Sequence, residues 1–269
     1  MLNKIYTLLL LATGSLLLAS CEKVIDVDIK TPPNQLVIEG NITDQLDLQT
    51  IKITQSVPYT DSNVYPPVQN ADVSVTTNDG VVLHFKESTP GNYTFGPYKG
   101  IPGKTYTLRV VIETAIYTAS STMPAPVRAD SLSIVNLKFG SSLRKIVAVH
   151  YQDPETTTNQ YRFIMKVNNT LTRRVYADND RLTNGNNVKE QLFYGSDDDN
   201  EELDTNDEVE VEMQCIDNDI FKYWYTLSQQ TQNGPGGGVT PGNPPSNINN
   251  NSLGYFSAHT TQTKTITVQ

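Results

Sequence analysis

Residues that commonly build metal and redox centres are scarce in this sequence. Its 269 residues include two cysteines, three histidines and one tryptophan. The histidines, His84, His150 and His259, fall in three separate predicted strands, so a site with two or three histidine ligands would have to be assembled from distant segments. A histidine that is packed or exposed in its strand is the simpler interpretation. We therefore predict no histidine-based metal site and no cofactor.

Positive charge is also in short supply. Lys and Arg number 20 against 29 Asp and Glu, which gives a formal net charge of −9. Because no stripe of basic residues offsets this balance, the chain repels nucleic-acid phosphates. The same charge disfavours flat adsorption onto anionic lipid. We therefore expect no nucleic-acid partner, and any membrane link must come from an anchor.

Catalytic signatures are missing as well. The sequence has no Gly-x-Ser-x-Gly elbow, no His-Glu-x-x-His, no Walker loop and no Rossmann glycine pattern. The glycine-rich run 234–238 lacks the Lys and the strand-to-helix setting that a phosphate cradle needs. Ser and Asp are abundant, but abundance alone does not indicate a nucleophilic triad. We expect that the protein is not an enzyme.

Long apolar runs are absent except at the start of the chain. After Lys4, an apolar run of about 15 residues extends from Ile5 to Ala19, which is shorter than the roughly 20 residues of a membrane span. It ends in Leu18-Ala19-Ser20-Cys21, the pattern of a bacterial lipobox. The thiol receives a diacylglyceryl group, the small side chains permit cleavage, and several acyl chains such as palmitate anchor firmly. We predict a signal peptide over residues 1–20 and lipidation of Cys21.

The residue after the lipidated cysteine bears on localisation. Position 22 is Glu, whereas Asp at this position retains many lipoproteins in the inner membrane. By analogy with those sorting rules, the sequence favours the outer membrane. It leaves open which face of that membrane the protein occupies, and it leaves the oligomeric state open.

Once Cys21 is lipidated, Cys215 has no partner for an intramolecular disulfide. Cys215 shares its inward parity with Val209, Val211 and Met213 in a predicted strand. Free cysteine is among the most often buried residue types, so we predict a buried core thiol and not a reactive one.

Short strands separated by turns dominate the mature chain. Residues 21–34 read as a tether, and residues 35–127 as an antiparallel sandwich of immunoglobulin-like or prealbumin-like type. The clearest signal is Asn78-Asp79-Gly80 between two alternating β-branched runs, which predicts a hairpin. The predicted strands of this part are 36–40, 50–55, 71–77, 81–86, 93–95, 105–111 and 117–122.

A proline-rich segment, 123–127, cannot pair regularly and marks the predicted start of a second β-rich domain at 128–269. A Gly-, Pro- and Asn-rich stretch at 233–254 is predicted to be a long mobile loop. The predicted strands of this part are 131–139, 145–151, 160–167, 171–176, 188–194, 208–216, 254–258 and 263–268.

One segment of the second part, 217–230, has the apolar period of a helix. Ile220, Trp224 and Leu227 fall on one face, and Asp217 or Asp219 can cap its start. Trp224 is the only tryptophan, and a core anchor is a simpler role for it than a ligand platform.

Carboxylates are concentrated between residues 197 and 208. Aligned with a twelve-residue calcium loop, this segment places Asp197, Asp199, Glu201 and Glu208 at positions one, three, five and twelve. Position six, where the loop needs Gly, is Glu202, and no flanking helices are predicted. A solvated acidic loop is the simpler interpretation, with calcium as the alternative. The run 178–180, Asp-Asn-Asp, is a second and smaller oxygen cluster.

Tyrosine is abundant, with 14 residues, many of them beside turns. Rigid amphipathic tyrosines suit recognition of sugars and protein partners, although strand tyrosines also pack well inside sandwiches. The tyrosines expected to be exposed are Tyr59, Tyr65, Tyr93 and Tyr98.

Five short motifs follow one another in a recognisable order: 21–27, 36–44, 66–75, 101–108 and 253–256. Their order resembles that of the Bacteroidota lipoproteins grouped as domain-of-unknown-function family 4249. The resemblance spans nearly the whole mature chain. It implies an outer-membrane lipoprotein that is often encoded beside TonB-dependent receptors, and it supplies no catalytic residues.

Three functions remain as hypotheses. The first is a non-catalytic accessory lipoprotein that binds a TonB-dependent receptor, a small-molecule or glycan nutrient, or both. The second is a free-standing surface adhesin or structural scaffold, which predicts no concave pocket. The third and weakest is a hydrolase, which for glycoside chemistry needs two carboxyl groups ~5–9.5 Å apart in a cleft. The tripeptide Asp130-Ser131-Leu132 also resembles a bacterial O-glycosylation motif.

Overall fold

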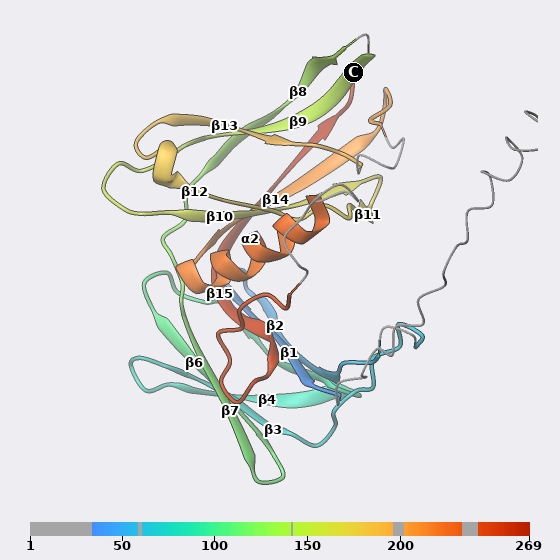
Figure 1. The fold of residues 1–269 in the computed structure, drawn as a ribbon. Helices are drawn as coiled ribbons and strands as arrows, with labels where there is room; N and C mark the ends of the chain where they lie inside the picture. The colour runs from blue at the N-terminus through green and yellow to red at the C-terminus, as the bar shows by residue number, and fades with distance from the viewer. Residues whose placement is uncertain (1–33, 59–60, 141, 196–201, 233–241) are drawn as a thin grey trace, which may run out of the picture. The chain divides into compact units, whose positions relative to one another are not determined.

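The computed structural model describes residues 34–58, 61–140, 142–195, 202–232 and 242–269. Asn34–Gln269 forms one compact unit, in which strands predominate and one α-helix is present. The predicted mainly β fold is therefore confirmed, and the sheets are arranged as sandwiches (Figure 1). The predicted signal peptide, Cys21 and most of the predicted tether lie outside the described residues.

The first sandwich is formed by two sheets that share strand β4. Its strands are β1 (Leu36–Thr43), β2 (Asp47–Gln55), β3 (Asp72–Thr77), β4 (Val82–Thr89), β5 (Asn92–Tyr98), β6 (Thr105–Ile112) and β7 (Ala115–Thr122). The order β1-β2-β5-β4-β3-β6-β7 places β4 between β5 and β3. Its C-terminal residues pair with β5 and its N-terminal residues with β3, so the chain passes from one sheet to the other within β4. Alternating apolar residues fill the space between the sheets, among them Ile38, Ile51, Val75, Tyr106 and Leu108.

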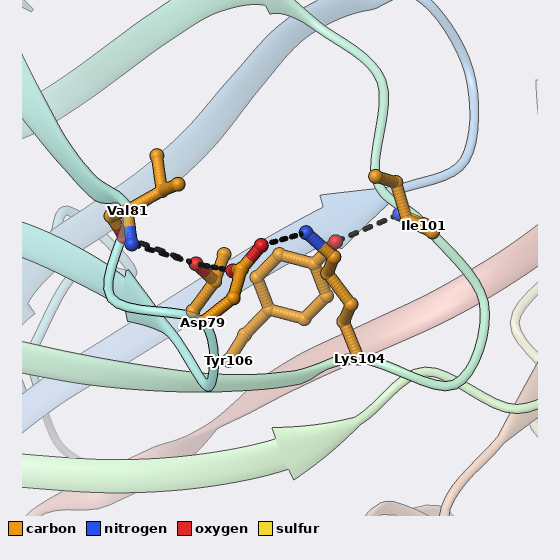
Figure 2. Close-up of polar contacts among 6 residues, drawn as sticks. Asp79, Val81, Ile101, Lys104 and Tyr106 are labelled. Atoms are coloured by element: carbon orange, nitrogen blue, oxygen red, sulfur yellow. Dashed lines mark hydrogen bonds and ion pairs between the residues drawn. The ribbon is translucent and has the colours of Figure 1, made fainter.

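The predicted hairpin is present, and its turn is held by side chains (Figure 2). The Asp79 carboxylate accepts hydrogen bonds from Thr77 Oγ1 at 2.5 Å and from Lys104 Nζ at 2.6 Å. These contacts, with Lys104 the larger, lower the pKa of Asp79 below its ordinary value. On the neighbouring turn, the Ile101 amide donates to the Tyr106 hydroxyl at 2.7 Å. The turn that links β3 to β4 is thus tied to the loop that precedes β6.

The second sandwich also consists of two sheets. One is the three-stranded sheet β13-β9-β8, made of β8 (Ala129–Phe139), β9 (Ser142–Gln152) and β13 (Asn187–Leu192). The other contains β10 (Gln160–Val167), β14 (Glu208–Ile216) and the C-terminal half of β15 (Leu253–Thr267), with the short strands β11 (Thr170–Leu171) and β12 (Tyr176–Asn179) on the free side of β10. A separate apolar cluster lies between these sheets, with Val147, Tyr161, Phe163, Val211 and Met213 at its centre.

Strand β15 belongs to both sandwiches. Its first half, 253–259, pairs in parallel with β1, and its second half, 260–267, pairs antiparallel with β14. Phe256 and Ala258 are buried in the first apolar cluster, and Val268 just beyond the strand is buried in the second. The segments 254–258 and 263–268 therefore belong to one continuous strand, so the prediction of two separate strands was wrong.

Helix α2 (Asn218–Gln232) lies on the outer face of the β10–β14–β15 sheet, where residues 217–230 were expected to be helical (Figure 1). Asp217 caps it, since its Oδ1 accepts from the amides of Asp219 and Ile220, each at 3.0 Å. Its apolar face, with Ile220, Phe221 and Trp224, packs onto the sheet.

Two further expectations from the sequence need revision. The strand predicted at 171–176 is interrupted, because only 170–171 and 176–179 pair with β10. In the loop predicted at 233–254, residues 242–252 pack against β7: Asn249 N donates to the Thr118 carbonyl, and Ile248 is buried. The boundary placed at Val127 divides neither the apolar clusters nor the 12-stranded sheet, because Phe256 and Ala258 belong to the first cluster and Val127 belongs to the second. The division into two domains stays a prediction.

Candidate functional site

A cavity of about 340 Å³ opens beside helix α2, where the edge strands of the second sandwich, β12 and β13, face each other. The segment 174–178 forms one wall, and Glu190, Gln191 and Phe193 form another. Helix α2 contributes Tyr225, Ser228 and Gln229. A concave site with aromatic rings and a few convergent polar groups is the usual form of a small-molecule site.

Two carboxyl groups meet in the wall of this cavity. Asp178 comes from β12 and Glu190 from β13, and their side chains form a hydrogen bond. Burial, followed by the charge and the side-chain hydrogen bonding of Asp178, raises the pKa of Glu190 to about 7. The structure thus places two acidic groups together in the wall of the cavity, and one of them has a raised pKa.

Both carboxyl groups occupy positions where the strand pattern expects apolar side chains. Glu190 lies between the buried Val188 and Leu192 on the same face of β13. Asp178 shares its face of β12 with Tyr176, which packs onto the second apolar cluster. An acidic residue at an inward position of an alternating strand was the available sequence signal for this site. Sequence reasoning noted 178–180 only as an oxygen cluster and passed over Glu190.

A buried polar network lies beneath the pair. The Tyr161 hydroxyl donates to Asp153, which is only 1% exposed and also accepts from the Gly185 amide at 3.2 Å. Burial raises the pKa of Tyr151 and of Tyr161, and the negative charges of Glu190 and Asp178 add to the effect at Tyr151. Both phenols therefore stay neutral, and that of Tyr161 acts as a donor toward Asp153.

Aromatic rings and one guanidinium complete the lining. The Tyr176 hydroxyl donates to the Phe193 carbonyl, which ties β12 to the end of β13. Arg174 Cζ lies 6.0 Å from the centre of the Phe193 ring, at the outer limit of a cation–π contact. Tyr225 on α2 is 45% exposed. The cavity therefore offers ring surfaces at its rim and acidic groups in its wall.

The residues weighed for calcium do not form a site in the part of the chain that is described. Asp197, Asp199 and Glu201 lie outside the described residues, and Glu208 is exposed at the start of β14. The nearby Asp207 carboxylate accepts from the Asp204 amide and from Asn168 Nδ2, each at 2.8 Å. No group of three or more His, Cys, Asp or Glu side chains suited to a metal occurs among the described residues.

The three histidines are not brought together. His84 is exposed on β4, and His150 on β9 shares a 2.7 Å hydrogen bond with Ser133 Oγ. His259 is buried in β15 and lies 3.0 Å from Ser257 Oγ. Neither histidine of these Ser–His pairs has a carboxylate hydrogen-bond partner among the described residues, so neither pair forms a triad.

Cys215 and Trp224 are both buried, as the sequence predicts. Cys215 is 2% exposed, its Sγ accepts from the Val127 amide at 3.3 Å, and burial raises the pKa of its thiol. Trp224 packs under the guanidinium of Arg162, whose Cζ lies 3.3 Å from the ring centroid. Burial lowers the pKa of that Arg162 guanidinium. Cys215 packs between the two sheets of the second sandwich, and Trp224 packs between α2 and the sheet.

The predicted tyrosine surface is only partly present. Tyr65 is 49% exposed, but Tyr93 is 1% exposed, so the expectation that Tyr93 lies on the surface was wrong. Its hydroxyl accepts from the Ala71 amide and donates to the Val68 carbonyl, which fixes the approach to β3. Tyr98 is partly buried against the first apolar cluster, and Tyr59 lies outside the described residues.

Among the described residues, the 57–70 loop does not line the cavity formed by the segment 242–253. That cavity, of about 430 Å³, is lined by Gln35 and residues between 244 and 253, and it has no aromatic side chain. The acidic and aromatic cavity beside α2 is therefore the better candidate for a binding site. No described helix is both long and apolar enough to cross a membrane.

The fold and the cavity define a class: a mainly β protein of two sandwiches joined by a shared strand, with one helix beside an acidic pocket. Residues 22–265 match the model of the domain of unknown function DUF4249, so the chain belongs to that family. A search of curated proteins finds no match.

Proposed function

We propose that the protein is a non-catalytic lipoprotein of the outer membrane, anchored through Cys21, that serves as the binding component of a TonB-dependent receptor or another nutrient uptake system. The observation that supports a binding role is the cavity beside α2, with its aromatic rim and acidic wall. The lipobox ending at Cys21 supports the anchor, and the family resemblance supports the receptor as partner.

The other two hypotheses fit the structure less well. A free-standing adhesin or scaffold needs no concave site, whereas this chain forms a cavity large enough for a small ligand. A glycoside hydrolase keeps its two carboxyl groups about 5 Å or more apart so that a sugar or water fits between them. Asp178 and Glu190 are in direct hydrogen-bond contact, which leaves no such space.

The test is an affinity pull-down of the native lipoprotein from gently solubilised outer membrane, read by mass spectrometry. We expect stoichiometric recovery of a TonB-dependent receptor. The matched control is Cys21→Ala, which cannot be lipidated and should lose both palmitate labelling and membrane retention. Recovery of the lipoprotein alone, from membranes in which the receptor is demonstrably present, contradicts the accessory role and favours the scaffold.

A further inference from the structure

The acidic pair in the cavity wall lacks an ion-pair partner in the part of the chain that the structure describes. Among the described residues, neither Asp178 nor Glu190 forms an ion pair with Lys, Arg or His. Buried carboxyl groups in folded proteins are normally paired with a cation or coordinate a metal. Arg174 lines the same cavity, but it forms no ion pair with either carboxyl group.

The position of the pair argues against a purely structural role. Val188 and Leu192, on either side of Glu190 in the same strand face, show that apolar side chains fit this layer of the sandwich. Replacing a buried polar pair by apolar residues is often neutral or stabilising, so packing alone does not require two acids here. Titratable groups with a perturbed pKa in a pocket are typical of functional sites.

The rest of the lining indicates which kind of cation fits. Tyr176, Phe193 and Tyr225 border the same cavity, and the faces of aromatic rings attract organic cations. A calcium ion instead takes six to eight oxygen ligands. The described residues hold no group of three or more acidic or histidine ligands. An organic ammonium compound would contact both the carboxyl pair and the aromatic rings, whereas a metal ion would contact only the carboxyl pair.

We propose that the cavity between β12, β13 and α2 binds an organic amine, with its ammonium group seated on the Asp178–Glu190 pair and its apolar part against the aromatic rings. This inference rests on the proposed binding role and names the ligand class for that cavity. Because the pKa of Glu190 is raised to about 7, the protonated form of this carboxyl group loses its proton to solvent as the ammonium arrives.

The groups that face the pair are compatible with this exchange. From β9, the neutral phenol of Tyr151 lies close enough for its pKa to be affected by Glu190 and Asp178. Arg174 lines the cavity from the segment before β12. When an ammonium group replaces a proton at the Asp178–Glu190 pair, the net charge near Arg174 stays the same. Helix α2 presents only uncharged side chains to the cavity: Tyr225, Ser228 and Gln229.

The experiment is isothermal titration calorimetry on the full lipidated protein in detergent. The probes are phenethylammonium chloride and its neutral analogue phenethyl alcohol, each titrated in two buffers of different ionisation enthalpy at pH 6.5. We expect saturable binding of the amine with net proton release, and no saturable binding of the alcohol. Equal binding of both probes, or amine binding without proton release, would overturn the proposal.

Two variants test whether amine binding and proton release occur at Asp178 and Glu190. Glu190→Gln keeps the shape and can still donate a hydrogen bond to Asp178, so it should fold; Asp178→Asn makes the reciprocal change. Each should weaken amine binding at least tenfold, and Glu190→Gln should abolish proton release. Glu208→Gln, at an exposed carboxylate on β14 outside the cavity, is the control and should bind as the parent does. Unchanged affinity in both cavity variants contradicts the site.

A calcium titration and the pull-down separate the remaining outcomes. Calcium that binds the parent and excludes the amine would assign the pair to a metal and overturn the proposal. Recovery of a receptor without any amine binding refutes the ligand class but leaves the accessory role standing. Amine binding without recovery of a receptor refutes the accessory role but supports the amine site.

Discussion

Two side chains, the buried His259 and the partly buried Glu190, give the folded protein opposite responses to pH. Burial, followed by the positive charge of Arg162, lowers the pKa of His259 from 6.5 to about 4. Between pH 6.5 and 4, the imidazole of His259 binds a proton in the unfolded chain but not in the folded chain. The free energy of unfolding therefore decreases as the pH falls from 6.5 to 4. Glu190 has a raised pKa, so stability is lost as pH rises from about 4.5 to about 7. The two effects oppose each other in one pH window.

Replacing His259 by Gln should therefore expose the response of Glu190. The uncharged amide keeps a polar group beside Ser257 and removes the pH response of the histidine, a swing of roughly 3–4 kcal/mol between pH 6.5 and 4. We expect the free energy of unfolding of His259→Gln to fall steadily from pH 4.5 to 7.5, measured by urea denaturation with Trp224 fluorescence. His84→Gln, on the exposed face of β4, is the control. A His259→Gln curve parallel to that of the parent would show that the histidine is not buried uncharged.

At the scale of elements, the start of β15 depends on one glycine. Gly254 has a φ of +90°, and a Cβ added there would lie 2.1 Å from the Ile38 carbonyl oxygen of β1. Gly80, in the β3–β4 turn, has a φ of +87° but no atom within 4 Å of such a Cβ. The two glycines therefore share the backbone strain and differ in the clash.

Gly80→Ala should cost about 1–2 kcal/mol of stability, the usual penalty for a left-handed residue with a side chain. Gly254→Ala should cost about 1–3 kcal/mol more, because the β1–β15 pairing must move apart to admit the methyl group. Urea denaturation of both variants measures the difference directly. Equal losses would mean that the parallel pairing of β1 with β15 is looser than the structure shows.

Most elements could be predicted from the sequence because their signals are local. The Asn78-Asp79-Gly80 turn lies between alternating strands, and the apolar period of 217–230 is helical, so hairpin and helix follow from neighbouring residues. The continuity of β15 could not be predicted, because its polar middle, 259–263, is explained only by the change of partner from β1 to β14. The cavity could not be predicted either, since Asp178 and Glu190 belong to two different sheets.

At the scale of the whole molecule, β15 links the two apolar clusters mechanically. Phe256 and Ala258 belong to the first cluster, Val268 belongs to the second, and Tyr255, next to Phe256, packs against Trp224 on α2. Loss of the first sandwich would leave one side of β15 without its partner strand and expose Phe256. We therefore expect the two sandwiches, residues 34–269, to unfold as one cooperative unit, although each has its own apolar cluster.

A core substitution in the first sandwich tests this coupling, because the single tryptophan reports on the second. Leu108→Ala, at a fully buried site on β6, should lower the free energy of unfolding by about 2–5 kcal/mol. We expect the Trp224 fluorescence transition and the far-UV circular dichroism transition to shift together in urea. Thr107→Ala, on the exposed face of the same strand, is the control and should change little. If the fluorescence transition stays in place while the circular dichroism splits into two steps, the sandwiches unfold independently and the boundary predicted at Val127 separates two domains.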